Sequence, residues 1–364
     1  MESTLSFRTG PAAGHAAPAA RVPIADDKAM LRAAAEMTRD LIAPRPRLYW
    51  ADMVGSALLG YAALGVAVTA GATGMIVAAS VVSVLALYRA LLFIHEISHM
   101  KHSALPGFRT GWNALVGVPL LTPAFMYEGV HNLHHAKTRY GTADDPEYLP
   151  LALMKPWTLP VFILVSALAP LGLLIRFAIL SPLSWVVPGL RKIVVERYSA
   201  LAINPQFRRR MPEGEALTLF NRTDAAASIW AMALVAMVAT GVIPLRGFAI
   251  GFAIGSAVAV LNQVRTLVAH LWENDGEPMT VTAQYLDSVN VPPPSLLPGL
   301  WAPVGLRYHA LHHLLPSLPY HALGEAHRRI SAAVTPESPY HKASYKGLPG
   351  LVAKIGLSTI RRGK

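Results

Sequence analysis

The 364-residue chain contains no cysteine and carries few charges. Without thiols it cannot form disulfides, iron–sulfur clusters, haem–thiolate centres or thiolate zinc sites, so histidine, carboxylate or water must hold any metal. Charged residues make up only 15% of the chain, against about a quarter in ordinary soluble domains. Because 53% of the residues are apolar, this composition indicates a protein dissolved in lipid.

Acidic residues are scarce too: 21 Asp and Glu stand against 32 Lys and Arg, which gives a formal charge of +11. The basic residues flank apolar stretches without interleaved aromatic residues, so we expect no nucleic-acid partner. Positive-inside orientation and anionic head groups explain the excess better. We expect a flexible cytoplasmic arm over 1–48, a membrane domain over 49–335 and a basic tail over 336–364.

Four apolar stretches have the length of about 20 residues that a helix needs to cross a bilayer. They are residues 53–70, 75–94, 225–245 and 247–271, which tight turns pair into two hairpins. Two further stretches, 112–125 and 157–180, are interrupted by prolines. We expect these two to form re-entrant or interfacial helices.

Basic residues decide between the possible topologies. Seven cations follow the second ambiguous stretch: Arg191, Lys192, Arg197, Arg208, Arg209, Arg210 and Arg222. If residues 157–180 dip into the membrane and return, these cations stay inside, as the positive-inside rule favours. The sequence thus predicts an all-α integral membrane protein, in the bacterial inner membrane, with four transmembrane helices, two re-entrant or interfacial helices and a helical cap. Both termini and the cap would be cytoplasmic.

Histidines cluster beside these stretches. The clusters are His95-Glu96-Ile97-Ser98-His99, His131-Asn132-Leu133-His134-His135 and His309-Ala310-Leu311-His312-His313. On a helix, spacings of three and four residues place the rings on one face. His270 stands alone at the end of an apolar run, where a lone histidine is more often a capping residue, but the topology puts it level with His95.

Together these positions give nine imidazoles for a predicted cytoplasmic metal site: His95, His99, His131, His134, His135, His270, His309, His312 and His313. A five- or six-coordinate ion takes four or five such ligands plus solvent, so nine suit two metals. Imidazoles with open positions suit iron, copper and zinc. A dinuclear site among apolar helices favours activation of O₂ and oxidation of an unactivated C–H bond.

Carboxylates near the clusters are candidates for accepting hydrogen bonds from the ligating imidazoles. The candidates are Glu96, Asp144, Asp145, Glu147, Glu273 and Asp275, with Asp287 further along the chain. For any one of these acids other than Glu96, solvation of a loop is an equally good explanation.

Two rival interpretations stay open at this point. His95-Glu96-Ile97-Ser98-His99 matches the H-E-x-x-H signature of membrane zinc metalloproteases, but a protease leaves both H-x-x-H-H clusters unexplained. A transporter or metal-handling protein would carry polar groups in the middle of several spans, where this chain is almost wholly apolar.

The three clusters in this order resemble those of the integral-membrane fatty acid desaturases and their sister hydroxylases, over roughly residues 50–330. The segment Gly305 to Pro316 resembles the third box of the bacterial acyl-lipid branch, and Arg265 to His270 its additional ligand segment. The resemblance implies two iron ions on the nine histidines and O₂ as co-substrate. It also implies a membrane lipid or acyl substrate and an external ferredoxin-, rubredoxin- or cytochrome b5-like electron donor. We expect desaturation of an acyl chain, with hydroxylation on the same fold as the alternative.

Overall fold

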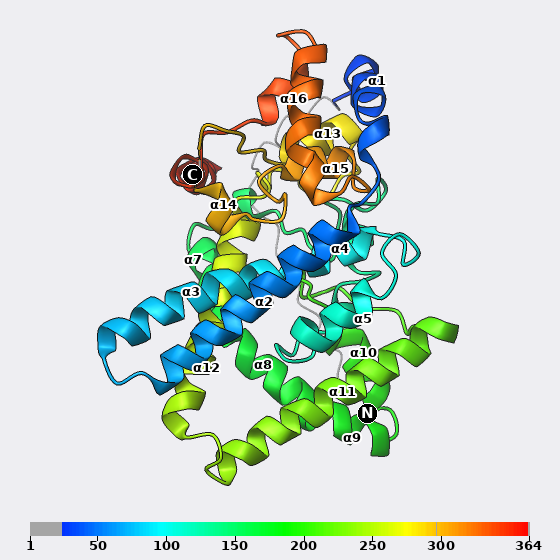
Figure 1. Cartoon of the computed structure of the whole chain (residues 1–364). Coiled ribbons are helices and arrows are strands. Elements are labelled where there is room, and N and C mark those ends of the chain that lie inside the picture. The colour runs from blue at the N-terminus through cyan, green and yellow to red at the C-terminus, as the bar shows by residue number, and fades with distance from the viewer. Residues whose placement is uncertain (1–23, 296, 363–364) are drawn as a thin grey trace.

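The computed structural model describes residues 24–295 and 297–362, and within these ranges all regular elements are helices. The predicted all-α class is therefore confirmed. Figure 1 shows long helices in the lower part of the molecule and a cap of short helices above them. The first 23 residues of the predicted arm lie outside the described residues.

Five helical stretches are long and apolar enough to cross a membrane, as in an integral membrane protein. They are α2 (Pro46–Thr69), α3 (Thr73–Leu91) with its continuation α4 (Phe93–His99), the broken helix Thr158–Val186, α11 (Gly214–Ala239) and α12 (Leu245–Leu267). Four of them cover the predicted spans. The fifth covers the stretch for which we expected a re-entrant helix, so the four-span layout stays a prediction.

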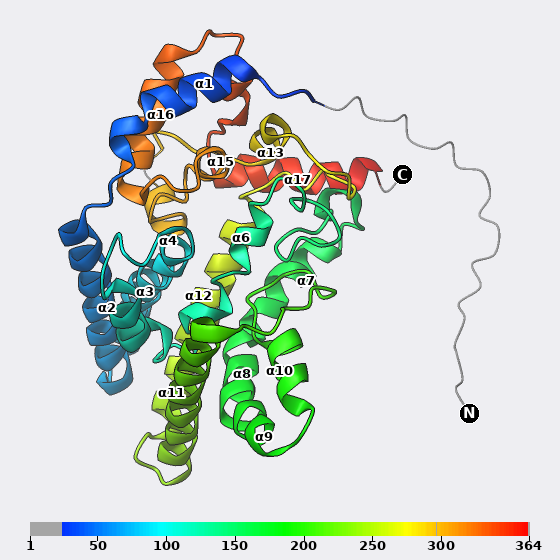
Figure 2. The ribbon, with the colours of Figure 1, turned by 90° about the vertical axis from the view of Figure 1, so that its right-hand side faces the viewer.

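The broken helix consists of α7 (Thr158–Leu164), α8 (Ala169–Ile175) and α9 (Ser181–Val186), joined by a 3-10 segment and a π segment. Pro170 and Pro182 each stand within the first two residues of a new helical segment, where the missing N–H costs no hydrogen bond. Figure 2 shows α10 (Leu190–Tyr198) running back beside α8 and α9. Buried Asp224 of α11 pairs with Arg176 and Arg191, which fixes this region to α11.

The first predicted hairpin is present as a packed pair, whereas α11 and α12 are joined by the predicted tight turn but do not pack along their lengths. α2 and α3 pack along their lengths, and α12 packs against α3 (Figure 1). Between α11 and α12, Gly241 adopts a left-handed φ of 77° two residues after α11 ends, the conformation that glycine supplies at helix C-termini. Arg246 then donates hydrogen bonds to the carbonyls of Val68 and Ala70, which ties the start of α12 to the tip of the first hairpin.

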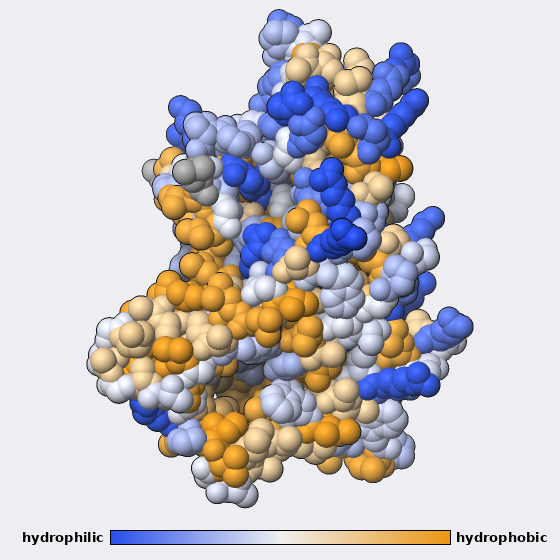
Figure 3. Space-filling view, viewed as in Figure 1, coloured by the Kyte–Doolittle hydropathy of each residue, from blue (hydrophilic) through white to orange (hydrophobic). Residues whose placement is uncertain are grey.

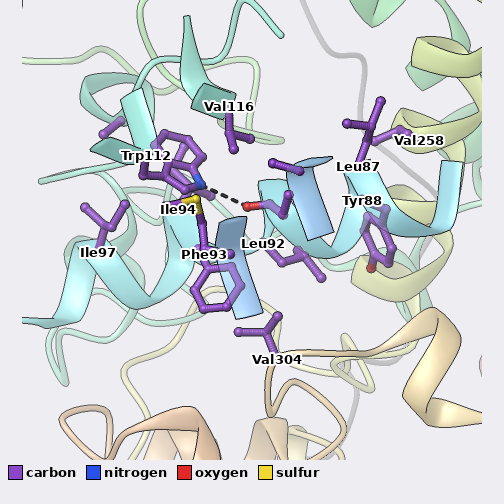
Figure 4. Close-up of a cluster of buried hydrophobic side chains, with 14 of the residues drawn as sticks. Leu87, Tyr88, Leu92, Phe93, Ile94, Ile97, Trp112, Val116, Val258 and Val304 are labelled. Carbon is purple, nitrogen blue, oxygen red and sulfur yellow. Dashed lines mark hydrogen bonds between the residues drawn. The ribbon is translucent and has the colours of Figure 1, made fainter. Parts of the chain in front are cut away.

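Apolar side chains fill the space where α3 continues into α4 (Figure 4). Fully buried Trp112, at the end of α5 (Phe108–Trp112), donates from Nε1 to the carbonyl of Ala90. This bond fixes α5 to the end of α3, just before the first histidine cluster. Val258 of α12 and Val304 of the cap reach the same cluster of side chains.

The cap above the long helices carries the second and third histidine clusters. Its helices are α1 (Lys28–Met37), α6 (His131–His134), α13 (Val281–Asp287), α14 (Pro298–Trp301), α15 (His309–Leu314), α16 (Leu323–Ala333) and α17 (Leu348–Arg362). Within the predicted arm, α1 buries Met30 and Ala34 in an apolar core that includes Ile330 of α16. Figure 3 shows a mainly hydrophilic surface over the upper cap and apolar surface over the α2–α3 hairpin.

Candidate metal centre

Four separate segments bring the nine predicted histidines together. α4 carries His95 and His99. α6 carries His131 and His134 of the second cluster, and His135 is the C-cap residue of this helix. α15 carries the third cluster, and His270 lies three residues beyond the end of α12. All four segments meet at the boundary between the long helices and the cap.

The nine imidazoles form two groups, and within each group one ring nitrogen of every histidine lies within 4.8 Å of the others. The first group consists of His95, His99, His131, His135 and His312. The second group consists of His134, His270, His309 and His313. We call these the five-histidine group and the four-histidine group.

Each H-x-x-H-H cluster is divided between the two groups, whereas we had expected its rings to share one face. In α6, His131 and His135 enter the five-histidine group and His134 enters the other. In α15 the division is reversed, because His309 and His313 join the four-histidine group and His312 the five-histidine group. The rings four residues apart stay together on one helix face, and the ring between them points to the neighbouring group.

The spacing of the Nε2 atoms fits two metal ions. Six pairs of these atoms lie 3.0–3.3 Å apart, three pairs in each group. Nitrogens that share one ion at a bond length of roughly 2.1 Å stand at about this separation, whereas bare lone pairs at this distance repel. Within the described residues, neither ring nitrogen of buried His95 has a hydrogen-bond partner, so its lone pair is free to bind a metal.

Electrostatics keep most of these rings neutral, which is the form that binds metal. Burial, followed by the charges of neighbouring imidazoles, holds the pKa of His131, His135, His309, His312 and His313 well below its usual value. A neutral imidazole offers one lone pair to a cation. His134 is the exception: burial lowers its pKa, but the carboxylates of Asp145, Glu147 and Asp287 together raise it above its usual value.

Two of the six predicted carboxylates contact ligand candidates directly. Glu147 Oε1 lies 2.7 Å from Nδ1 of His131, and the Tyr127 hydroxyl donates to its other oxygen. Asp145 Oδ2 lies 2.9 Å from Nδ1 of His134. Each contact places the proton on Nδ1 and turns the Nε2 lone pair toward the group.

His270 is oriented through a tyrosine that the sequence did not indicate. Its Nδ1 lies 2.8 Å from the hydroxyl of Tyr140, which donates to Asp287 at 2.8 Å. Since that hydroxyl has one proton, it accepts from Nδ1–H of His270 and leaves Nε2 free to ligate. Tyr148 also donates to Asp287, at 3.0 Å. No spacing rule connects Tyr140 with His270, 130 positions along the chain.

Of the other four predicted carboxylates, Glu96, Asp144 and Asp275 form no hydrogen bond to a ligand candidate within the described residues. Glu96 accepts from the Tyr49 hydroxyl and from the backbone N–H of Tyr320, and its nearest oxygen is 3.7 Å from Nδ1 of His95, too long for a hydrogen bond. Asp144 and Asp275 are exposed. The backbone N–H of Glu273 donates to Asp287 at 3.2 Å, so Glu273 lies beside the tyrosine-linked carboxylate.

Comparison with known proteins shows the family. Residues 72–346 match the fatty acid desaturase family. The chain belongs to it. A ceramide hydroxylase from Caulobacter vibrioides (strain NA1000 / CB15N) is 50% identical over 324 residues, which cover 89% of this chain and 92% of that protein. The chain is therefore an oxygen-dependent oxidoreductase of lipids, as the resemblance to this family implied.

The comparison bears on the expected reaction type. From the sequence we expected desaturation rather than hydroxylation. The Caulobacter relative is a hydroxylase, so the comparison supports the alternative better. The metalloprotease and transporter interpretations do not agree with membership of this family.

Proposed function

We propose that this protein is a di-iron hydroxylase of ceramide-type lipids in the bacterial inner membrane. The observation that carries the proposal is the division of nine histidines into two adjacent groups of five and four. One mononuclear zinc site needs only three protein ligands and would leave most of these rings without a role. The ceramide class is supported by the activity of the Caulobacter relative.

The described residues suit this reaction. When bound, two irons would supply the chemistry that uses O₂ and two external electrons to insert oxygen into an unactivated C–H bond and release water. The chain holds the ligand rings in orientation through Glu147, Asp145 and Tyr140. Both α6 and α15 contribute to both groups, so neither helix can shift without disturbing the two positions together. Apolar side chains around α4 exclude water from this side of the groups.

Lipid analysis of a host that contains ceramide tests the proposal. We expect ceramides that have gained one oxygen atom when the wild-type chain is expressed, and none with His313→Ala. His102→Ala is the matched control, because His102 is exposed, contacts Glu128 and belongs to neither group. A product that has lost two hydrogens would establish desaturation. Unchanged ceramides together with a single zinc per chain would overturn the proposal.

The proposed external electron carrier needs a docking surface, and a basic one requires arginines whose charge is exposed and is not neutralised by a carboxylate. Arg209 donates to the carbonyls of Phe125 and Ser199, and Arg328 and Arg329 pair with Glu325. Arg210 is exposed in the same segment as Arg209, and Arg208 is exposed too, although it donates to the carbonyls of Pro205 and Phe207. They provide a basic surface for an acidic ferredoxin-, rubredoxin- or cytochrome b5-like carrier.

The absence of cysteine allows a direct test of the proposed cytoplasmic orientation. Single cysteines at Ser103, Gln206 and Val242 can be labelled with a membrane-impermeant maleimide in intact cells and in opened cells. In the four-span layout Val242→Cys alone reacts in intact cells, because it lies in the turn between α11 and α12. Reaction of Gln206→Cys in intact cells would instead show that Thr158–Val186 crosses the membrane.

A further inference from the structure

A groove of about 470 Å³ lies on the first hairpin, and none of the nine histidines lines it. α2 and α3 form its walls, and Gly299, Leu300 and Pro303 close it from the cap. Leu59 and Val82 are half exposed at its apolar end. The groove therefore opens on the apolar surface seen over this hairpin in Figure 3.

The other end of the groove is polar. Arg89 of α3 donates to both carboxylate oxygens of Asp52 of α2, from Nε at 2.7 Å and from Nη2 at 2.5 Å. The hydroxyl of Tyr320 donates to the same carboxylate at 2.8 Å. The Arg89 side chain keeps 36% of its surface exposed, so the pair stays accessible from the groove. This end offers donors and acceptors with no net charge.

The ion pair lies at the height of a bilayer surface. Eighteen residues of α2 separate Asp52 from Ala70, which corresponds to about 27 Å of helix rise, close to a hydrocarbon core of roughly 30 Å. Arg246 binds the carbonyl of Ala70 at the far tip. Charged side chains thus mark both ends of the hairpin, with the Asp52–Arg89 pair at the end nearer the histidines and the apolar part of the groove inside the lipid.

We infer that this groove binds one ceramide-type lipid by its head group before oxidation, an assignment of lipid class that rests on the proposed function. Such a head group is uncharged and presents an amide and hydroxyls, which match the paired carboxylate and guanidinium. A phosphate would meet the Asp52 carboxylate beside the arginine. The first part of an alkyl chain would follow Leu59 and Val82 toward the bilayer centre.

Tyr320 joins the groove to Glu96, the residue next to His95 in the chain. Tyr320 contacts Asp52 through its hydroxyl, and its backbone N–H donates to Glu96 at 3.0 Å. Glu96 directly follows His95 in α4. Arg89 and His95 are six residues apart on the nearly continuous helix α3–α4, about 9 Å along its axis. A head group at Arg89 is therefore held close to the five-histidine group, which favours oxidation near the head group over oxidation far down the chain.

Two glycines of α2 provide a matched test. Gly55 lines the groove, Gly65 does not, and a Cβ built at either position meets no atom within 4 Å. Gly55→Leu therefore fills the groove without a clash at Cβ, and Gly65→Leu adds the same side chain on an exposed part of the same helix. Both changes raise helix propensity.

The readout is photolabelling of the full-length protein in nanodiscs with a diazirine-bearing ceramide, followed by peptide mapping. We expect label in residues 51–59 and 82–89, reduced by excess ceramide but not by phosphatidylglycerol. Gly55→Leu should lower it by roughly tenfold or more, equivalent to about 1.4 kcal/mol of binding, and Gly65→Leu should leave it unchanged. Equal labelling of the two variants, or equal competition by phosphatidylglycerol, overturns the inference.

This result is separable from the proposed function. If the wild-type protein is labelled in the groove but does not oxidise ceramide, the binding site is supported and the proposed hydroxylase activity is overturned. If the protein hydroxylates ceramide but is not labelled in the groove, the proposed function is supported and the binding site is overturned.

Discussion

The two histidine groups differ in burial and in what supports their rings. All members of the four-histidine group are buried, whereas His99 and His135 of the five-histidine group are partly exposed. In the smaller group, two of four rings are oriented by Asp145 and by the Tyr140–Asp287 pair. In the larger group, Glu147 orients His131. The smaller group thus depends on oriented ligands, and the larger group on their number.

Removing a ligand from each group gives the largest effect and tests this difference. His270→Ala leaves three imidazoles in its group, and we expect iron to fall toward one ion per chain, with hydroxylation lost. His99→Ala leaves four imidazoles, so we expect it to retain more iron. Elemental analysis of the purified variants measures this. Equal iron loss in both would show that ligand number does not distinguish the groups.

Asp145 provides the next test, because it is fully buried against His134. Asp145→Asn removes the charge that holds the His134 proton on Nδ1, and we expect a loss of roughly 10- to 100-fold in iron affinity or activity. Asp144→Asn is the control, since its side chain is exposed one position away. If both asparagine variants bind iron equally well in a chelator competition, the Asp145 charge does not orient His134 for metal binding.

Glu147→Gln should have a smaller effect than Asp145→Asn. The glutamine can still accept from His131, and four other imidazoles remain in that group. We expect a loss of roughly tenfold, at the lower end for residues that orient metal ligands. Single-turnover oxidation of ceramide measures it at saturating iron. A loss larger than that of Asp145→Asn would reverse our view of which group depends on orientation.

The spans and the histidine clusters could be predicted because both signals are local. Apolar length identifies α2, α3, α11 and α12, and helical spacing identifies which rings can share a face. The broken helix Thr158–Val186 was ambiguous because its prolines begin new helical segments as readily as they end a span.

The internal arrangement of the site could not be predicted. The division of each H-x-x-H-H cluster depends on how α6 and α15 face one another, which is a tertiary property. Among neighbouring acids, Asp145 is buried and Asp144 exposed because of how the loop folds, and the spacing of the two cannot distinguish them. Tyr140 reaches His270 only through packing of distant segments.

Tyr140→Phe should have the smallest effect. It tests whether the hydroxyl that orients His270 strengthens metal binding by the four-histidine group. The change removes the hydroxyl between His270 and Asp287, but Ser288 Oγ lies 3.2 Å from the same Nδ1 and can replace it as acceptor. A lost buried hydrogen bond costs about 1 kcal/mol, so we expect a lower unfolding temperature and a several-fold weaker hold on one iron.

Tyr148→Phe is the matched control for that variant, because Tyr148 donates to Asp287 without a hydrogen bond to His270. Both variants remove one donor to Asp287 and should lower the unfolding temperature similarly. Chelator competition should separate them, since only Tyr140 connects the carboxylate to a ligand. If both variants release iron equally, Tyr140 acts through packing alone, and the four-histidine group owes its order to burial rather than to oriented imidazoles.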